Sequence, residues 1–295
     1  MRLTRFAALA ASAALMLGAA ACGGGGSSGG SGSDVKKDVK FDAGTTMEAL
    51  NKAQKIKIGT KFDQPLFGLK GLDGKPAGFD VEIAKIIAGE LGIPADKIEW
   101  VETPSKVREE YIEQAKVDMV VATYTINDAR KQRIDFAGPY YVAGQQILTR
   151  KDDNSISGPD SFKDGTKKVC SVTGSTPAKT IEQYLKDKAT QLVLFDTYAK
   201  CADAVKNKQV DALTTDNVIL SGFVSQSPND FKLVGSKFTQ EPYGIGVKKG
   251  DTKFRAFIND VLEKIAKDGR YEKAWKDTVG KVDSNTPSAP AVDRY

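Results

Sequence analysis

The chain has 295 residues, of which 43 are Lys or Arg and 38 are Asp or Glu, so its formal net charge is only +5. Acidic and basic residues alternate without a concentrated basic stripe, which argues against a nucleic-acid partner. The sequence contains no histidine, which excludes Ser-His-Asp and Cys-His catalysis and histidine metal sites, and we expect neither a metal nor a cofactor.

The first 22 residues predict an export signal. Arg2 and Arg5 give it a positive start, an apolar, alanine-rich run follows, and small residues precede Cys22. This order is typical of a lipoprotein signal in which Cys22 is acylated and becomes the mature N-terminus, although Ala19 stands where leucine is usual. The alternative is plain secretion, with Cys22 lost or free. The apolar run is too short to be a lasting membrane span.

The segment 23–45 predicts a tether, because residues 23–33 are only Gly and Ser and have nothing to bury. At the other end, residues 283–295 are polar and rich in proline, and we expect them to be disordered. The body between these ends is large enough for two lobes with cores of their own. A lipid, a tether and a globular body predict a protein anchored at the extracellular face of the cell membrane.

The first half of the body alternates between strand and helix patterns. Its clearest helix has apolar residues on one face at helical spacing: Phe79, Ile83, Ile86, Ile87 and Leu91. In chain order we predict a strand at 55–60, a loop at 61–75, the helix from 79 to 91, a strand at 99–101, a helix at 107–114 and a strand at 117–122. This alternation is typical of a parallel sheet with helical crossovers.

A second alternating unit begins near residue 167, and the stretch 139–148 would join the two units. In chain order we predict strands at 168–172, 192–195, 210–214 and 231–234, with helices at 178–186, 198–205 and 217–224 between them. A strand at 243–247 and two helices, with apolar faces at 254–265 and 271–275, end the body. The expected fold class is therefore α/β, with two similar units.

Two cysteines remain besides the one at the export signal. In an exported protein, Cys170 and Cys201 are expected to form a disulfide. The bridge would close a loop of about thirty residues, which is worth roughly 3–4 kcal/mol in the chain-entropy model. The alternative is a pair of buried thiols.

Residues 123–130 place two hydroxyl groups, the N–H groups of a helix start and one guanidinium after the strand at 117–122. Asn127 or Asp128 can cap that helix. The combination is suited to a carboxylate, because Arg130 can bind both oxygens while the N–H groups add dipoles. Open α/β sheets also bind ligands at strand C-terminal ends. The alternative is an ordinary surface arginine.

Two features of the second unit have similar positions. Asp216 stands at a strand's end, where it can bind a cation or simply cap the helix from Asn217. The turn 174–177 has proline in a first helical turn, so bare N–H groups face outward. The alternative for that turn is an ordinary capped helix.

The sequence also carries a family resemblance. Four motifs in this order resemble the extracellular solute-binding proteins for polar amino acids, the capture subunits of ABC importers: GFDVEIA at 78–84, VD at 117–118, TINDAR at 125–130 and DFAGPY at 135–140. The match runs from about residue 56 to 279. Within that family the chain is similar to glutamate-binding lipoproteins of Gram-positive actinobacteria, on VCS at 169–171, GSTP at 174–177 and TTDN at 214–217.

The resemblance implies a type II periplasmic-binding-protein-like fold. Two α/β lobes, joined by a two-strand hinge, would close on a ligand held in a deep cleft. Lobe one would comprise residues 46–143 and 239–282, and lobe two residues 144–238. The implied partners are an amino-acid ligand and the membrane permease of an ABC importer, and we expect the protein to be a monomer.

The resemblance also implies roles for individual residues. Arg130 would clamp the ligand's α-carboxylate, together with Thr125 and the backbone of Thr123. The turn before lobe two's first helix would donate N–H groups from Ser175 and Thr176. The aspartate after the 210–214 strand, Asp216, would receive the α-ammonium.

The ligand's side chain would meet residues from lobe one. Lys61 leaves the first strand where the family reads the side chain, and a lysine there fits a carboxylate, although it can also be a solvated loop lysine. Arg108 is a second candidate cation, or a structural arginine facing Asp135 or a helix carboxylate. Phe62 and Tyr124 are candidate walls for the ligand's methylenes, and either can equally belong to the core or the rim.

These residues lead to a hypothesis of acidic amino-acid capture, with L-glutamate as the first candidate and glutamine, aspartate and asparagine still open. Arg130 and Lys61 against Asp216 give the pocket a charge of +1, which complements a ligand of charge −1. The main alternative is a cyclohexadienyl dehydratase-like enzyme on the same fold. Asp63 and Glu241 are the residues that would then be candidates for a general acid.

Overall fold

The computed structural model describes residues 35–295. The predicted export signal, the acylation of Cys22 and the Gly/Ser stretch of the tether lie outside these residues. Within the part that is described, we find no helix with both the length and the apolar character that a membrane crossing requires.

The first of two five-stranded sheets in the described residues has the strand order β5-β1-β6-β13-β7. β1 pairs in parallel with β5 and β6, whereas β13 runs antiparallel to β6 and β7. The strand bounds are β1 (Ile56–Thr60), β5 (Ile98–Glu102), β6 (Met119–Val120), β7 (Asp135–Ala143) and β13 (Glu241–Val247). We call the part of the chain around this sheet lobe one.

The second five-stranded sheet has the order β10-β9-β11-β8-β12, and the part around it is lobe two. β9 pairs in parallel with β10 and β11, while β8 runs antiparallel to β11 and β12. The strand bounds are β8 (Gln145–Arg150), β9 (Val169–Val172), β10 (Leu192–Phe195), β11 (Ala212–Asp216) and β12 (Phe231–Val234). Both sheets are thus parallel on one side and antiparallel on the other.

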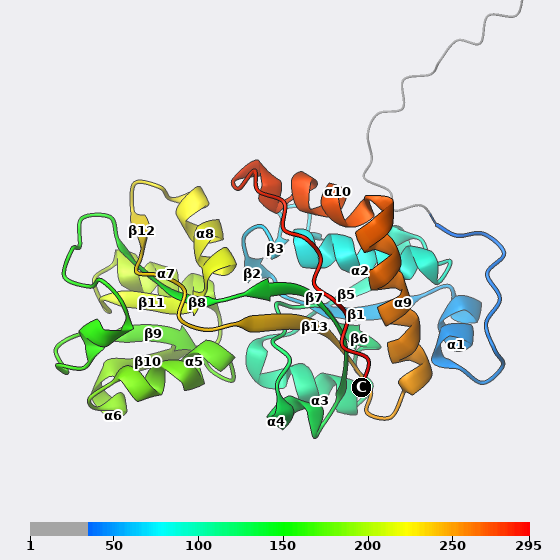
Figure 1. Cartoon of the computed structure of the whole chain (residues 1–295), viewed down its shortest axis with the longest axis horizontal. Helices are drawn as coiled ribbons and strands as arrows, with labels where there is room; N and C mark the ends of the chain where they lie inside the picture. Colours follow the sequence, from blue (N-terminus) through cyan, green and yellow to red (C-terminus); the bar gives the residue numbers. More distant parts are fainter. Residues whose placement is uncertain (1–34) are drawn as a thin grey trace, which may run out of the picture. The chain divides into compact units, whose positions relative to one another are not determined.

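Two strand connections join the lobes (Figure 1). β7 passes into β8 with only Gly144 between them, and the chain returns from β12 through residues 235–240 into β13. Because β13 pairs with β7 along most of its length, the two crossing segments lie side by side. The predicted two-lobed α/β fold with a two-strand hinge is confirmed.

Helices pack on both sheets. In lobe one they are α1 (Thr46–Ala53), α2 (Phe79–Glu90), α3 (Arg108–Glu113), α4 (Asp128–Lys131), α9 (Thr252–Asp268) and α10 (Arg270–Asp277). In lobe two they are α5 (Thr176–Ile181), α6 (Lys188–Gln191), α7 (Tyr198–Lys206) and α8 (Asn217–Gln226). Short 3₁₀ turns complete the set: η1 (Ala95–Lys97), η2 (Ser105–Val107), η3 (Pro159–Phe162), η4 (Glu182–Tyr184) and η5 (Val279–Lys281).

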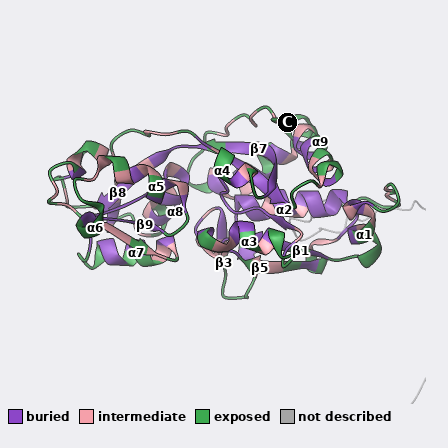
Figure 2. Cartoon of the chain, turned by 90° about the horizontal axis from the view of Figure 1, so that it is seen from below, coloured by how far each residue is buried: buried purple, intermediate pink, exposed green. Residues whose placement is uncertain are grey.

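The core of lobe one explains why α2 is almost entirely buried (Figure 2). Phe79, in its first turn, meets Tyr271 and Trp275 of α10 edge-on, with ring centroids 5.4 and 5.3 Å apart. Edge-to-face pairs of this kind add to the gain from apolar burial. This packing holds the first turn of α2 in place, and Asp80 in that turn faces the end of β6.

Four local features differ from the sequence expectations. The segment 61–75, expected to be a loop, contributes to a small antiparallel sheet of β2 (Asp63–Gln64), β3 (Gly68–Lys70) and β4 (Pro76–Ala77). The strand expected at 117–122 is reduced to the two residues of β6, and the helix expected at 178–186 ends at Ile181 and continues as the turn η4. Helix α1 was not anticipated, although Thr45 caps it by accepting the Glu48 N–H, and the Glu48 carboxylate accepts the Gly44 N–H.

The C-terminal segment 283–295 carries no helix or strand. We expected it to be disordered from its composition, but in the structure it makes specific hydrogen bonds to lobe one. The Asp293 N–H donates to the Gly138 carbonyl at 2.8 Å, and the Phe136 N–H donates to the Tyr295 hydroxyl oxygen at 2.9 Å. The segment thereby covers the outer edge of β7. Backbone groups of an edge strand need partners, a demand that composition alone does not reveal.

The predicted disulfide is present. Cys170 of β9 and Cys201 of α7 are bonded, with their Cα atoms 5.6 Å apart, and both residues are fully buried. The alternative of two separate buried thiols is therefore excluded in this structure. The bridge ties a central strand of lobe two to the helix that follows its neighbour β10.

We predict that the double variant Cys170→Ser/Cys201→Ser unfolds with about 3–4 kcal/mol less free energy than the wild type, because the bridge spans 31 residues of chain. Chemical denaturation with and without reductant measures this. Reductant should shift the wild-type midpoint and leave the double variant unchanged. An identical wild-type midpoint under both conditions would contradict the prediction.

Candidate functional site

Polar and charged residues gather at the C-terminal ends of strands in both lobes. Lys61 follows β1, Thr123 and Thr125 follow β6, Ser175 follows β9, and Asp216 ends β11. All five are buried. Parallel strands end at one edge of their sheet, which is where ligands bind in open α/β folds. The fold therefore brings most of the predicted site residues to the region between the lobes.

Arg130 lies at the meeting point of the two lobes and is 7 % exposed. Within lobe one, its Nε donates to Glu109 Oε1 at 3.0 Å and its Nη1 to the Thr125 carbonyl at 2.7 Å. Across to lobe two, Nη1 donates to Thr176 Oγ1 and Nη2 to the Gly174 carbonyl, both at 3.1 Å. The arginine is thus held in place by one lobe while its outer edge reaches the other.

The ring of Tyr124 packs against the guanidinium groups of both Arg108 and Arg130. Its centroid lies 4.1 Å from the Arg108 guanidinium carbon and 5.1 Å from that of Arg130. The ring is fully buried and meets Phe136 edge-on at 4.9 Å. The structure therefore places Tyr124 in the core, as a cation–π platform for two guanidinium groups, rather than as a wall for ligand methylenes.

Arg108 is the second guanidinium on this platform. Its Nη1 donates to the carbonyls of Ala122 at 2.9 Å and Thr123 at 3.4 Å, while its Nε is buried without a partner in the described residues. It does not face Asp135, which we named as a possible partner, because Asp135 pairs with Lys249 at 3.0 Å. Arg108 thus presents an unused donor in the same region as Arg130.

Asp80 is a buried residue in the first turn of α2 that our sequence analysis did not single out. Its Oδ2 accepts the Thr123 N–H at 2.8 Å, and its Oδ1 accepts the Tyr140 hydroxyl at 2.6 Å. Thr123 has φ +44°, an uncommon backbone conformation for a residue other than glycine. The N–H that we expected to face the ligand therefore binds Asp80 instead, and the Thr123 hydroxyl donates to Gln64 at 2.9 Å.

Lys61 is 3 % exposed, which excludes a solvated loop lysine. Its Nζ donates to Ser105 Oγ at 2.8 Å. Burial and the charge of Arg108 lower the pKa of Lys61 to about 7, with Asp63 opposing the shift. Phe62 beside it is only half-buried, with Lys70 Nζ 5.0 Å from its ring, so it belongs to the rim.

Lobe two contributes the turn before α5. Ser175 caps this helix by accepting the Ala178 N–H at 3.0 Å, and its own N–H donates to the Val172 carbonyl at 3.1 Å. Gly174 has φ +79°, and a Cβ there would lie 2.7 Å from Lys106 Cα of lobe one. Only glycine permits so close an approach of the lobes.

Asp216 is 2 % exposed and lies where β11 ends. Its Oδ2 accepts the Tyr243 hydroxyl at 2.5 Å, whereas its Oδ1 is buried without a partner in the described residues. Asp216 is the N-cap residue of α8, but its side chain makes no capping hydrogen bond to that helix. Burial and the charge of Glu241 raise the pKa of Asp216 to about 7, against the opposing effect of the Tyr243 hydrogen bond.

Asp63, a candidate general acid in the enzyme alternative, is already engaged. Its Oδ2 accepts the Tyr198 N–H of α7 at 2.7 Å, so the carboxylate helps to hold the lobes together. Within residues 35–295, we find no cluster of His, Cys, Asp or Glu side chains that could hold a metal ion.

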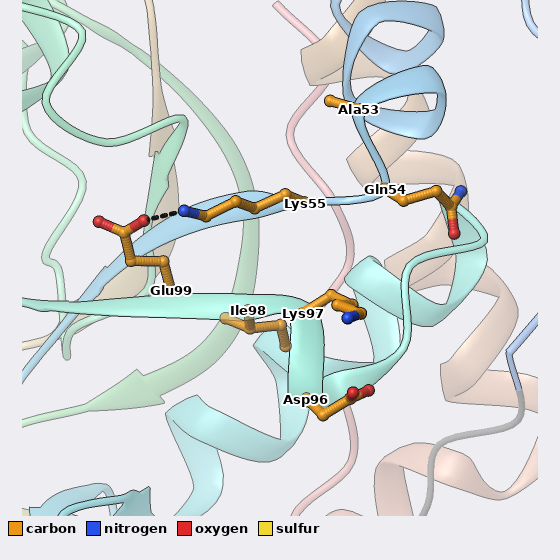
Figure 3. Close-up of a pocket in the computed structure, with 7 residues that line it drawn as sticks. All are labelled: Ala53, Gln54, Lys55, Asp96, Lys97, Ile98 and Glu99. Carbon is orange, nitrogen blue, oxygen red and sulfur yellow. Dashed lines mark ion pairs between the residues drawn. The ribbon is translucent and has the colours of Figure 1, made fainter.

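A cavity of about 280 Å³ opens beside Arg130, lined by α3 and α4 of lobe one and by Gly174 of lobe two. A different hollow, of about 400 Å³, lies at the N-terminal ends of β1 and β5 (Figure 3). Its wall holds an exposed ion pair, Lys55 with Glu99, at 2.5 Å. The second hollow is thus at the other end of the strands from the buried charges, whereas the first borders Arg130.

The family model for bacterial extracellular solute-binding proteins, family 3, matches residues 56–280. The chain belongs to this family. It is 40 % identical over 245 residues to the glutamate-binding protein GluB of Corynebacterium efficiens, covering 79 % of this chain and 82 % of the relative. It is 38 % identical over 247 residues to the ABC transporter glutamine-binding protein GlnH of Bacillus subtilis, covering 83 % and 88 %.

Solved structures agree with the family assignment. An ancestral arginine-binding protein bound to glutamine matches with a TM-score of 0.71 and 35 % identity, covering 77 % of this chain and 98 % of that one. As a member of family 3, the chain is an extracellular solute-binding protein. The names of these relatives describe binding proteins with different amino-acid ligands, so the ligand has to be argued from the charges of the site.

The buried Lys61 yields a pH-dependent prediction. Its pKa falls from 10.5 in the unfolded chain to about 7 in the fold, so keeping it neutral costs stability that is absent above pH 10.5 and grows as the pH falls toward 7. At about 1.4 kcal/mol per pKa unit, the full cost is roughly 4–5 kcal/mol. Lys61→Met should therefore gain stability over the wild type at and below pH 7.

The gain should shrink as the pH rises toward 10, and chemical denaturation of the ligand-free proteins at several pH values measures it. The exposed Lys75 provides a matched control, since Lys75→Met should show no such pH-dependent gain. A difference between wild type and Lys61→Met that stays constant from pH 6 to about pH 10 would refute the role of burial.

Proposed function

We propose that this chain captures an acidic amino acid, with L-glutamate as the first candidate, and delivers it to the permease of an ABC importer. The observation that carries the proposal is a set of buried, incompletely paired charges of opposite sign between the lobes. Lys61, Arg108 and Arg130 lie on the side of lobe one, and Asp216 lies at the end of β11. An amino acid with a second carboxylate complements both sides.

The main-chain groups of the ligand find a partner on each side. Arg130 can bind the α-carboxylate with both outer nitrogens, which now contact Gly174 and Thr176. Thr125 supports it by fixing the guanidinium through its carbonyl. The unpartnered Oδ1 of Asp216 is suited to accept the α-ammonium.

The side-chain carboxylate of the ligand would lie near Lys61 and the free Nε of Arg108. These two cations favour glutamate over glutamine, because the side-chain carboxylate of glutamate adds a negative charge beside them and the neutral amide of glutamine does not. The charge of a bound carboxylate would also restore an ordinary, protonated Lys61. The proposal therefore assigns the choice of ligand to Lys61.

Closure of the lobes would follow from contacts with both of them, since a ligand shifts a conformational equilibrium only through differential contacts. The anchoring of the chain through Cys22, its place at the outer face of the membrane and its monomeric state belong to the same proposal. Binding without chemistry is favoured because the similar proteins are named as binding proteins. Of the two candidate general acids, Asp63 already accepts a backbone hydrogen bond, whereas Glu241 keeps one oxygen without a partner in the described residues.

We predict that Arg130→Ala weakens glutamate binding by about 3–5 kcal/mol, as expected when one member of a buried ion pair is removed. Isothermal titration calorimetry measures the affinity, and thermal unfolding checks that the variant folds, since Glu109 also loses its partner. Arg294, an exposed arginine paired with Asp260, provides the control. Near-unchanged binding by a folded Arg130→Ala would remove the basis of the proposal.

Lys61→Met separates glutamate from glutamine. Because the methionine keeps the stem but not the charge, we expect glutamate affinity to fall by about tenfold or more and glutamine affinity to change far less. Calorimetry with both ligands on the wild type and the variant gives the comparison. Equal losses for the two ligands would show that Lys61 does not read the side chain.

A further inference from the structure

Glu241 is a buried carboxylate that the proposed binding roles leave unused. It is the first residue of β13, pairs with Ala143 of β7 and is 2 % exposed. Its Oε1 accepts the Thr239 hydroxyl at 2.9 Å, while Oε2 has no hydrogen-bond partner in the described residues. A buried carboxylate oxygen without a hydrogen-bond donor lowers the stability of the fold, which suggests that Glu241 has a role besides folding.

Asp216 presents the same situation from lobe two. Its Oδ1 is also buried and unpartnered, and Tyr243, two residues along β13 from Glu241, holds its other oxygen. Burial and the charge of Glu241 together raise the pKa of Asp216. Burial also raises the pKa of Glu241, although hydrogen bonding to Thr239 and Thr125 opposes this shift. The two side chains are thus electrostatic neighbours that together offer two free acceptor oxygens.

Other charged or titratable groups face this pair from each element around it. They are Tyr243 on β13, Arg108 on α3, Arg130 on α4, Tyr198 on α7 and Tyr141 on β7. Arg108 and Arg130 lower the pKa of Asp216, yet the net shift remains upward. The arginines therefore do not replace a cation placed directly between the two carboxylates.

We infer that Glu241 is a specificity-determining residue, which together with Asp216 forms a two-carboxylate receptor for the ligand's ammonium group. An ammonium carries three N–H donors, so it can satisfy both unpartnered oxygens at once. A dicarboxylic acid that lacks the amino group leaves both of these buried oxygens without a donor. The receptor thereby selects amino acids against their deaminated counterparts.

The empty receptor holds a proton, because two buried carboxylates that are electrostatic neighbours do not both ionise easily. When the ammonium enters, that proton passes to solvent and the two carboxylates are left ionised around the cation. The preference for an ammonium ligand should therefore increase as the pH rises through about 7, the pKa of Asp216. This inference rests on the proposed capture of an acidic amino acid.

The test compares L-glutamate with glutarate, which has the same two carboxylates and no amino group. Contributions from Lys61 and Arg130 cancel in the ratio of the two affinities, so the ratio reports on the ammonium receptor alone. Calorimetry on the full chain at pH 7 should show that Glu241→Gln lowers the glutamate-to-glutarate ratio by about tenfold or more, the cost of a lost charged hydrogen bond. The exposed Glu110 supplies a matched control, Glu110→Gln, which should keep the wild-type ratio.

A second measurement needs no variant. In the wild type, the glutamate-to-glutarate ratio should rise between about pH 6 and pH 8, where the carboxyls of both ligands are already ionised. A ratio that is flat over this range, or a folded Glu241→Gln that keeps the wild-type ratio, would overturn the inference while leaving glutamate capture intact. A wild type that binds no glutamate at all would overturn both.

Discussion

The region between the lobes buries more charge than it can pair with its own residues. The pKa of Lys61 is lowered to about 7 and that of Asp216 is raised to about 7, because each group is buried and lies near a charge of its own sign, Arg108 for the lysine and Glu241 for the aspartate. A fold gains nothing from such an arrangement, since neutralising both groups costs stability near neutral pH. The fold of the rest of the chain compensates for this cost, and a ligand with complementary charges would relieve it.

The remaining structure fixes these charges in position. Tyr124 supports two guanidinium groups from the core, and Glu109 together with the Thr125 carbonyl sets the rotation of Arg130. Asp80 binds the backbone of Thr123 and so shapes the bend after β6. Each of these contacts lies within lobe one, whereas Gly174 and Thr176 contact Arg130 from lobe two.

The sequence indicated which charged residues lie at strand ends, but it did not indicate the residues that hold them in place. Arg130 and Asp216 were identifiable because each follows an apolar strand and stands beside helix-start signals. Asp80 was not, because an acid in a first helical turn is common and its partners, Thr123 and Tyr140, lie far along the chain. The anchored C-terminal segment escaped for the same reason: its proline-rich composition says nothing of the open strand edge that it covers. Long-range pairing is what local patterns cannot encode.

The disulfide lies wholly inside lobe two, between β9 and α7, and does not cross the two hinge strands. Oxidation can therefore reinforce that half of the molecule without tethering it to the other half. The stability of lobe two and the movement of one lobe relative to the other thus depend on separate parts of the chain. A substitution that deletes the disulfide, or one that adds a second disulfide within lobe two, can therefore change the stability of that lobe without altering the hinge strands.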